Sequence, residues 1–226
     1  MSGRVSEYGK GARPFDLLFA NYDAWYEREP GKSIFTIEAY ALKQALHRKP
    51  ESCLEVGVGT GRFAKKLSVK FGVDAAFKPL YIARKRGALC VQGVGEHLPF
   101  RGNTFDVSLM VVTLCFVSNP QKVIREVFRI LRPGGQIVIG MVLRESPWGK
   151  TYAKKAKEGH PFYTIASFYS CEEIIRWLKL SGFTDIGILS TLFQPPGKPN
   201  YKFEMPREGY EISAGFTVFN AKKAGD

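Results

Sequence analysis

The chain has few cysteines and histidines and no long apolar run, and each scarcity excludes a class of protein. Its four cysteines form no C-x-x-C pair and have no histidine at zinc-ligand spacing, so we expect neither a metal site nor a disulfide framework. The longest apolar run, residues 107–117, is too short to cross a bilayer. The first ten residues are polar and do not resemble a signal sequence. These absences predict a cytoplasmic protein without a membrane span.

Acidic residues are also scarce relative to basic ones. Lys and Arg total 33 against 21 Asp and Glu, which gives a formal net charge of +12. Such an excess keeps a polyanionic partner such as nucleic acid open. The basic residues are spread along the chain, however, so we favour a lysine-rich surface over a nucleic-acid interface.

Short apolar segments alternate with amphipathic ones through most of the 226 residues. This alternation predicts an α/β domain with a parallel sheet and right-handed crossovers. The expected strands lie near residues 52–56, 69–74, 89–92, 105–112, 136–142, 184–192 and 210–220. The expected helices lie near residues 33–46, 59–67, 79–86, 123–131 and 171–180. Residues 1–20 are expected to be loosely held, and residues 144–168, rich in Pro, Gly, Lys and aromatics, are expected to form a lid without strands.

A glycine-rich turn follows the first expected strand and is the most specific motif in the chain. It reads E-x-G-x-G-x-G, with Glu55 at the strand end and glycines at 57, 59 and 61. Glycine lets the backbone turn tightly and approach a ligand closely. The spacing differs from the G-x-G-x-x-G of dinucleotide enzymes, and an acid at this place suits a ligand with an amino group better than a pyrophosphate.

A second acid marks the next strand end. Asp74 lies seventeen residues after Gly57, where the ends of neighbouring parallel strands meet. A carboxylate at this place accepts both hydroxyls of a ribose in nucleotide-binding sheets. The alternative is an ordinary turn or helix-capping aspartate, which the pairing with the glycine motif makes less favoured.

Taken together, these motifs resemble class I S-adenosylmethionine-dependent methyltransferases, in the branch that includes ubiquinone and menaquinone biosynthesis enzymes. The resemblance covers residues 20–190. It rests on the glycine motif and on further fragments in the family's order: G-V-D at 72–74, I-A-R-K-R-G at 82–87, E-H-L-P-F at 96–100 and R-I-L-R-P-G-G at 129–135.

This resemblance implies a Rossmann-like, seven-stranded, mostly parallel sheet with helices on both faces, an antiparallel last strand and a lid. One methyltransferase domain would span residues 1–226, with an N-terminal helical cover (1–50), a cofactor-binding core (51–142), the lid (143–169) and a C-terminal helix with strands (170–226). The implied cofactor is S-adenosyl-L-methionine, with S-adenosyl-L-homocysteine as product. The implied cofactor-binding residues are Glu55, Gly57, Gly59, Gly61, Asp74, Ala75, Gly95, Glu96, Val112, Thr113 and Tyr22.

Within that set, the resemblance places Glu55 near the ammonium of the methionine part and Asp74 on the ribose. Val112 and Thr113 would lie near the sulfonium. One position departs from the family pattern: Val94 stands where an acid often accepts from the adenine amino group. Either Glu96 substitutes for it, or backbone and apolar contacts hold the adenine.

The acceptor is the least determined part. If a general base is needed, His160 and Tyr163 in the lid are weak candidates, and packing roles are the alternative for both. Lid aromatics favour a small-molecule acceptor. A methyltransferase acting on RNA or protein and a non-catalytic nucleotide-binding module remain alternatives, and the sequence leaves the oligomeric state open.

Overall fold

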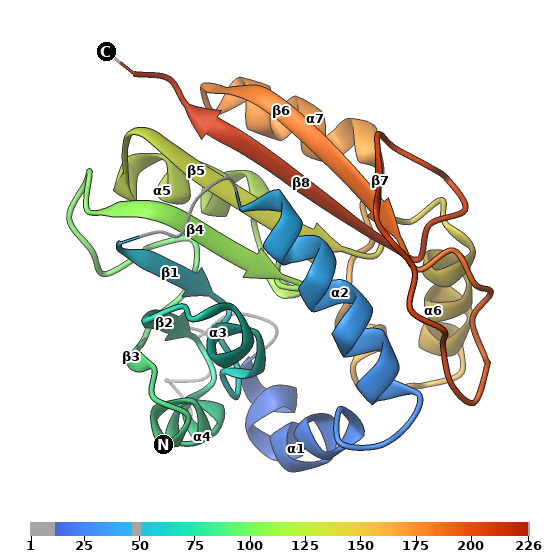
Figure 1. Cartoon of the computed structure of the whole chain (residues 1–226). Coiled ribbons are helices and arrows are strands. Elements are labelled where there is room, and N and C mark those ends of the chain that lie inside the picture. Colours follow the sequence, from blue (N-terminus) through green and yellow to red (C-terminus); the bar gives the residue numbers. More distant parts are fainter. Residues whose placement is uncertain (1–11, 47–50, 226) are drawn as a thin grey trace.

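The fold is built on one eight-stranded sheet in a computed structural model that describes residues 12–46 and 51–225 (Figure 1). The strand order is β3-β2-β1-β4-β5-β8-β6-β7. The strands are β1 (Cys53–Val56), β2 (Phe71–Asp74), β3 (Leu89–Gln92), β4 (Phe105–Val111), β5 (Leu131–Met141), β6 (Phe183–Thr191), β7 (Arg207–Glu208) and β8 (Phe216–Lys223). The α/β class and the Rossmann-like arrangement predicted from the sequence are confirmed.

The strand directions agree with the prediction, but the strand count does not. Strands β1 to β5 pair in parallel, and β8 runs antiparallel to both β5 and β6. The expected number of seven is wrong because β7, only two residues long, pairs with the outer edge of β6. A two-residue strand is too short to show the alternation of apolar and polar residues from which strands are predicted.

Helices cover both faces of the sheet. Figure 1 shows α2 crossing one face, with α5 and α7 on the opposite face. The helices are α1 (Ala12–Trp25), α2 (Gly31–Ala45), α3 (Arg62–Leu67), α4 (Phe77–Lys85), α5 (Pro120–Ile130), α6 (Pro147–Lys157) and α7 (Cys171–Leu180), with 3-10 turns η1 (Leu114–Phe116) and η2 (Tyr163–Ile165). Among these described helices, none has both the length and the apolar character that crossing a membrane requires.

The central strand β4 supplies side chains to two separate hydrophobic cores. Leu109 packs with α2 on one face, and Met110 packs with α5 and α7 on the other; both are fully buried. A strand that is apolar on both faces is typical of the middle of a parallel sheet. This rigid centre fixes the ends of β1, β2 and β4, where the candidate site lies.

The N-terminal segment differs most from expectation. Residues 12–20, expected to be loosely held, form most of helix α1, and residues 1–11 lie outside the described part. Helix α2 begins at Gly31, two residues before the predicted cap Ser33, whose hydroxyl donates to the carbonyl of Pro30 at 2.9 Å. The missed signal in α1 is the recurrence of Phe15, Phe19 and Tyr22 at helical spacing.

The lid region contains helix α6 and the turn η2 and contributes no strand, as predicted. The helix that follows has its predicted bounds. In the capping box of α7, the backbone N–H of Glu173 donates to the Ser170 hydroxyl at 3.2 Å, and the backbone N–H of Ser170 donates to the Glu173 carboxylate at 2.8 Å.

Candidate active site

The glycine turn after β1 uses its three glycines for three different purposes. A side chain on Gly57 would collide with Thr113, and one on Gly61 would lie 3.0 Å from the Cα of Ala83 in α4. At Gly59 a Cβ would meet nothing within 4 Å, so this residue faces open space. All three have positive φ (+78°, +52° and +76°), which glycine adopts without strain. Only Gly57 and Gly59 line the first cavity; Gly61 lets α3 and α4 pack closely.

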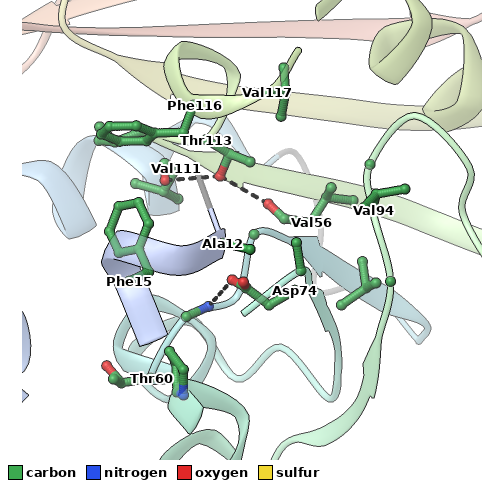
Figure 2. Close-up of a pocket in the computed structure, with 18 of the residues that line it drawn as sticks. Ala12, Phe15, Val56, Thr60, Asp74, Val94, Val111, Thr113, Phe116 and Val117 are labelled. Atoms are coloured by element: carbon green, nitrogen blue, oxygen red, sulfur yellow. Dashed lines mark hydrogen bonds between the residues drawn. The ribbon is translucent and has the colours of Figure 1, made fainter. Parts of the chain in front are cut away.

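Asp74, at the end of β2, is joined directly to this turn. Its Oδ2 accepts from the N–H of Gly59 at 2.7 Å (Figure 2). Its Oδ1 accepts from the N–H of Ala76 at 2.8 Å. Burial raises the pKa of Asp74 to about 6, against the lowering effect of these N–H donors. Each carboxylate oxygen has two acceptor positions, so one on each remains for a ligand.

Glu55 lies apart from the first cavity. Its side chain is almost fully buried, and its Oε2 has no hydrogen-bond partner among the described residues. Burial raises the pKa of its carboxyl well above the ordinary value, and the Ala64 N–H in the first turn of α3 offsets only part of that rise. Glu55 therefore supports the turn from the side of α3 and forms no part of the cavity wall.

The first cavity lies at the carboxyl ends of β1, β2 and β4, where open α/β sheets bind ligands. Its volume is about 120 Å³. Figure 2 shows Ala12 and Phe15 of α1 on one side of it and Asp74, Val94 and Thr113 around the rest. The predicted residues that line it are Gly57, Gly59, Asp74, Ala75, Gly95, Glu96, Val112, Thr113 and Tyr22.

Thr113, which follows β4, and Glu96, which follows β3, use their polar groups in hydrogen bonds to the protein backbone. The hydroxyl of Thr113 lies 3.0 Å from the carbonyl oxygen of Val56, to which it donates. The Oε1 of Glu96 accepts from the N–H groups of Ser118 and Asn119 at 2.8 and 3.1 Å. Val94 on the same wall is apolar, so no carboxylate stands at the place where the family often has one.

An ion-pair cluster clamps helix α1 over the glycine turn. The carboxylate of Asp23 accepts from Arg62 at 2.8 Å, from Arg86 at 2.7 Å and from the hydroxyl of Thr60 at 2.5 Å. Burial alone would raise the pKa of Asp23, but the two guanidinium groups and the hydroxyl hold it well below its usual range. Asp16 of α1 also accepts from the Lys78 N–H in α4 at 2.7 Å. The clamp holds α1 closed across the cavity.

A second, larger cavity of about 330 Å³ adjoins the first. It is lined from α1, α2, η1, α6 and η2, and eight of its eighteen lining residues are Phe, Tyr or Trp. Tyr22, Val112 and Phe116 line both cavities, so these residues form the boundary between them. The aromatic residues of the second cavity are Tyr22, Trp25, Tyr26, Phe116, Tyr152, Phe162, Tyr163 and Phe168.

Val112 holds an unusual backbone conformation at this boundary. Its φ is +51°, which is strained for a β-branched residue. Its N–H donates to the carbonyl of Gly140 at 2.8 Å, and its carbonyl accepts from the thiol of Cys115 at 3.2 Å. Strain of this kind persists where the surrounding structure fixes the backbone, often at functional sites.

Both candidate bases from the lid line the second cavity. The ring of Tyr163 stacks against His160 (centroids 4.2 Å apart) and against Tyr152 (4.3 Å). Burial and nearby Lys155 lower the pKa of His160, and burial raises the pKa of Tyr163 to about 12. At neutral pH the histidine is therefore uncharged and the tyrosine is protonated.

Glu38 is the residue of this cavity that the sequence reasoning missed. It belongs to α2, is 6% exposed, and has no hydrogen bond or ion pair with any residue in the described ranges. Burial raises the pKa of its carboxyl to about 8. The available signal was a single acid at an inward position of α2, four residues after Ile34 and four before Leu42.

Comparison with known proteins identifies the family. The chain matches the methyltransferase domain family over residues 54–139. A solved S-adenosylmethionine-dependent methyltransferase from Thermotoga maritima is 34% identical, with a TM-score of 0.87 over 94% of this chain and 99% of that chain. This chain belongs to the S-adenosylmethionine-dependent methyltransferases. Its cofactor is S-adenosylmethionine, as the motifs implied.

Two other relatives of the methyltransferase extend the comparison. An uncharacterised protein of Methanocaldococcus jannaschii is 40% identical over 209 residues, which are 92% of this chain and 98% of that protein. A demethylmenaquinone methyltransferase of Corynebacterium kroppenstedtii is 31% identical over 133 residues, 57% of this chain and 58% of that protein. The likeness to the quinone enzyme is therefore confined to little more than half of each chain.

Proposed function

We propose that the methyltransferase binds S-adenosylmethionine in the first cavity and methylates a small molecule held in the second. The observation that carries this proposal is the boundary that the two cavities share at Tyr22, Val112 and Phe116. A donor and an acceptor held in two adjoining cavities can approach each other at this shared boundary without leaving the protein. Holding two reactants in line supplies on the order of 7–11 kcal/mol of the barrier reduction in favourable cases.

The residues of the first cavity suit this cofactor. The open side of Gly59 leaves room for a ligand against the backbone of the turn. The unused acceptor positions of Asp74 suit two ribose hydroxyls, and the apolar walls at Val94 and Pro79 suit an adenine held by packing. We assign the methionine part to the Gly57–Gly59 side and the reacting end to Val112 and Tyr22. Glu55, which lies behind the turn, would act on the cofactor only through the backbone that it supports.

When bound, S-adenosylmethionine supplies a methyl group on a positively charged sulfur, which is already activated for displacement. The protein's own contribution is to align, enclose and dry the reaction site. Tyr22 and Phe116 present aromatic faces at the boundary, where a cation is attracted to a π system. The Asp23 clamp keeps α1 closed, which excludes water.

Relatives differ in the acceptor that their names give. The Thermotoga maritima protein is described as a possible histamine N-methyltransferase, and the Corynebacterium kroppenstedtii protein as a demethylmenaquinone methyltransferase. Both names refer to acceptors that contain a ring and are not macromolecules, which agrees with the aromatic residues of the second cavity. The +12 charge is the observation that favours a nucleic-acid acceptor instead.

A labelling experiment separates these acceptors. The protein is incubated with S-adenosylmethionine carrying a labelled methyl group and with a cell extract divided into metabolites, RNA and protein. We expect label in the metabolite fraction, accompanied by an equal amount of S-adenosylhomocysteine. Label confined to RNA or protein would contradict the small-molecule proposal, and cofactor binding without any transfer would favour a non-catalytic module.

A further inference from the structure

The second cavity contains one carboxyl group among aromatic and other uncharged side chains. Of the described residues that line it, only Glu38 bears a formal charge at neutral pH when ionised. The lining residues within the described ranges include no Lys or Arg, although the chain as a whole is strongly basic. When it loses its proton, Glu38 gives this cavity a negative charge, opposite in sign to the net charge of the whole protein.

An unpaired buried carboxylate is costly and calls for an explanation. Burial of a polar group without a compensating partner is unfavourable, and buried acids are usually paired. Glu38 is more than nine-tenths buried and has no partner among residues 12–46 and 51–225. A merely structural position on the inward face of α2 would be better served by an apolar residue. The natural partner of such a carboxylate is a ligand.

The aromatic walls indicate which kind of ligand completes it. Burial raises the pKa values of Tyr22, Tyr26, Tyr152 and Tyr163, and each of these phenols also lies close enough to Glu38 for its charge to raise the pKa further. A carboxylate surrounded by aromatic faces is complementary to an organic cation, which gains both an ion pair and cation–π contacts. A neutral quinone or phenol would leave the carboxylate unpaired.

We propose that the methyl acceptor is a small arylalkyl amine and that Glu38 binds its basic nitrogen. This inference rests on the proposed function, because it assigns the second cavity to the acceptor. The amine enters as R–NH3⁺ and pairs with the Glu38 carboxylate. Passing one proton to that carboxylate leaves R–NH2 and the neutral Glu38 acid, which frees the nitrogen lone pair. That lone pair would form the bond to the methyl carbon as the bond from this carbon to sulfur breaks, with the electron pair of the broken bond left on sulfur, and the product would be R–NH2⁺–CH3.

Other titratable groups that face Glu38 do not compete for this proton at neutral pH. The tyrosines from α1, the following turn, α6 and η2 keep their protons because burial raises their pKa values, as it does for Cys115 from η1. His160, before η2, has a pKa lowered by burial and by Lys155 and stays neutral. Binding of an ammonium to the protonated acid therefore releases about one proton to solvent near pH 7.

The test is calorimetric and does not depend on turnover. The protein is saturated with S-adenosylhomocysteine and titrated with a panel of arylalkyl amines, headed by 2-phenylethylamine, and with the matching alcohols, headed by 2-phenylethanol. Each titration is repeated in two buffers of different ionisation enthalpy to count released protons. The variants are Glu38→Gln, Glu38→Asp and, as a matched control, Glu208→Gln, whose side chain is exposed on β7.

We expect the wild type and Glu208→Gln to bind amines in preference to alcohols and to release close to one proton. Glu38→Gln should weaken amine binding by about 50-fold or more, leave alcohol binding within a few fold, and abolish proton release. Glu38→Asp should keep part of the amine affinity and part of the proton release that Glu38→Gln loses. Equal affinity for amines and alcohols, or unchanged amine binding in Glu38→Gln, overturns the inference.

Failure of the inference is distinct from failure of the proposed function. If S-adenosylhomocysteine binds and no amine on the panel does, the amine assignment is wrong while the methyltransferase assignment stands. If S-adenosylhomocysteine itself does not bind, the assignment of the first cavity is wrong.

Discussion

The stability of the Glu38→Gln variant relative to wild type should increase as the pH rises from acid to alkaline. In the unfolded chain Glu38 loses its proton near pH 4.5, whereas burial raises its pKa to about 8 in the folded protein. Between these values the folded state holds a proton that the unfolded state has lost. The contribution of Glu38 to stability therefore falls as pH rises from 4.5 to 8.

The size of the effect follows from the difference between the two pKa values. One pKa unit corresponds to about 1.4 kcal/mol, so the loss approaches roughly 4–5 kcal/mol above about pH 8. Glutamine is similar in shape to glutamate and does not titrate. The free energy of unfolding of the Glu38→Gln variant minus that of wild type should thus rise with a slope of up to about 1.4 kcal/mol per pH unit and then level off.

The measurement is urea denaturation followed by tryptophan fluorescence at unit steps from about pH 4 to 9, a range that brackets both pKa values. Subtracting the wild-type curve cancels the titration of all other groups. If the difference in unfolding free energy between Glu38→Gln and wild type does not change with pH, Glu38 is not an unpaired carboxyl that stays protonated in the folded protein. A slope of the opposite sign would show that Glu38 is paired with a cation in the ligand-free protein.

Three further predictions concern the first cavity. Asp74→Asn should weaken S-adenosylhomocysteine binding by roughly 10- to 100-fold in calorimetry, because a charged acceptor for two hydroxyls is lost. The control variant Asp185→Asn, at an exposed position, should bind as tightly as wild type. Equal affinity of the two variants would mean that the ribose site is misplaced. Gly59→Ala should weaken that binding and lower the free energy of unfolding by about 1 kcal/mol. Gly61→Ala should lower the free energy of unfolding by about 2–3 kcal/mol in chemical denaturation, because its Cβ meets the backbone of α4. The reverse order would contradict the different roles given to these glycines. Asp23→Asn should speed the release of S-adenosylhomocysteine about tenfold in stopped-flow fluorescence. The closed cavity is smaller than the ~300 Å³ of ordinary ligand pockets, so α1 must open for the ligand to leave. An unchanged release rate would show that the clamp does not control access.

The sequence was most informative where local chemistry determines structure. The glycine turn, the acid at the end of β2 and the Ser170 capping box depend on residues close together in the chain, and their geometry follows from short-range hydrogen bonds and allowed φ values. The order of strands and helices followed from hydrophobic periodicity. The expectation that residues 1–20 are loosely held was wrong for residues 12–20, because Phe15, Phe19 and Tyr22 repeat at helical spacing and form one face of α1.

What the sequence could not provide were properties that arise from packing between distant segments. Glu55 is adjacent to the glycine turn in the chain, but its side chain points toward α3 and away from the cavity, and only the strand pleat in three dimensions decides this. Glu38 shares its cavity with residues of α1 and of the lid elements α6 and η2, which come from two distant parts of the chain. The division of residues 1–226 into cover, core, lid and C-terminal segments stays a prediction.

Direct detection of the methylated product tests the central claim. The protein is incubated with S-adenosylmethionine and the arylalkyl amine panel, and products are followed by mass spectrometry alongside S-adenosylhomocysteine. Two cavities that meet at Val112 predict N-methylated amine and S-adenosylhomocysteine in equal amounts, with both greatly reduced in Glu38→Gln. Methylated RNA, protein or neutral phenols in place of methylated amines would contradict the account.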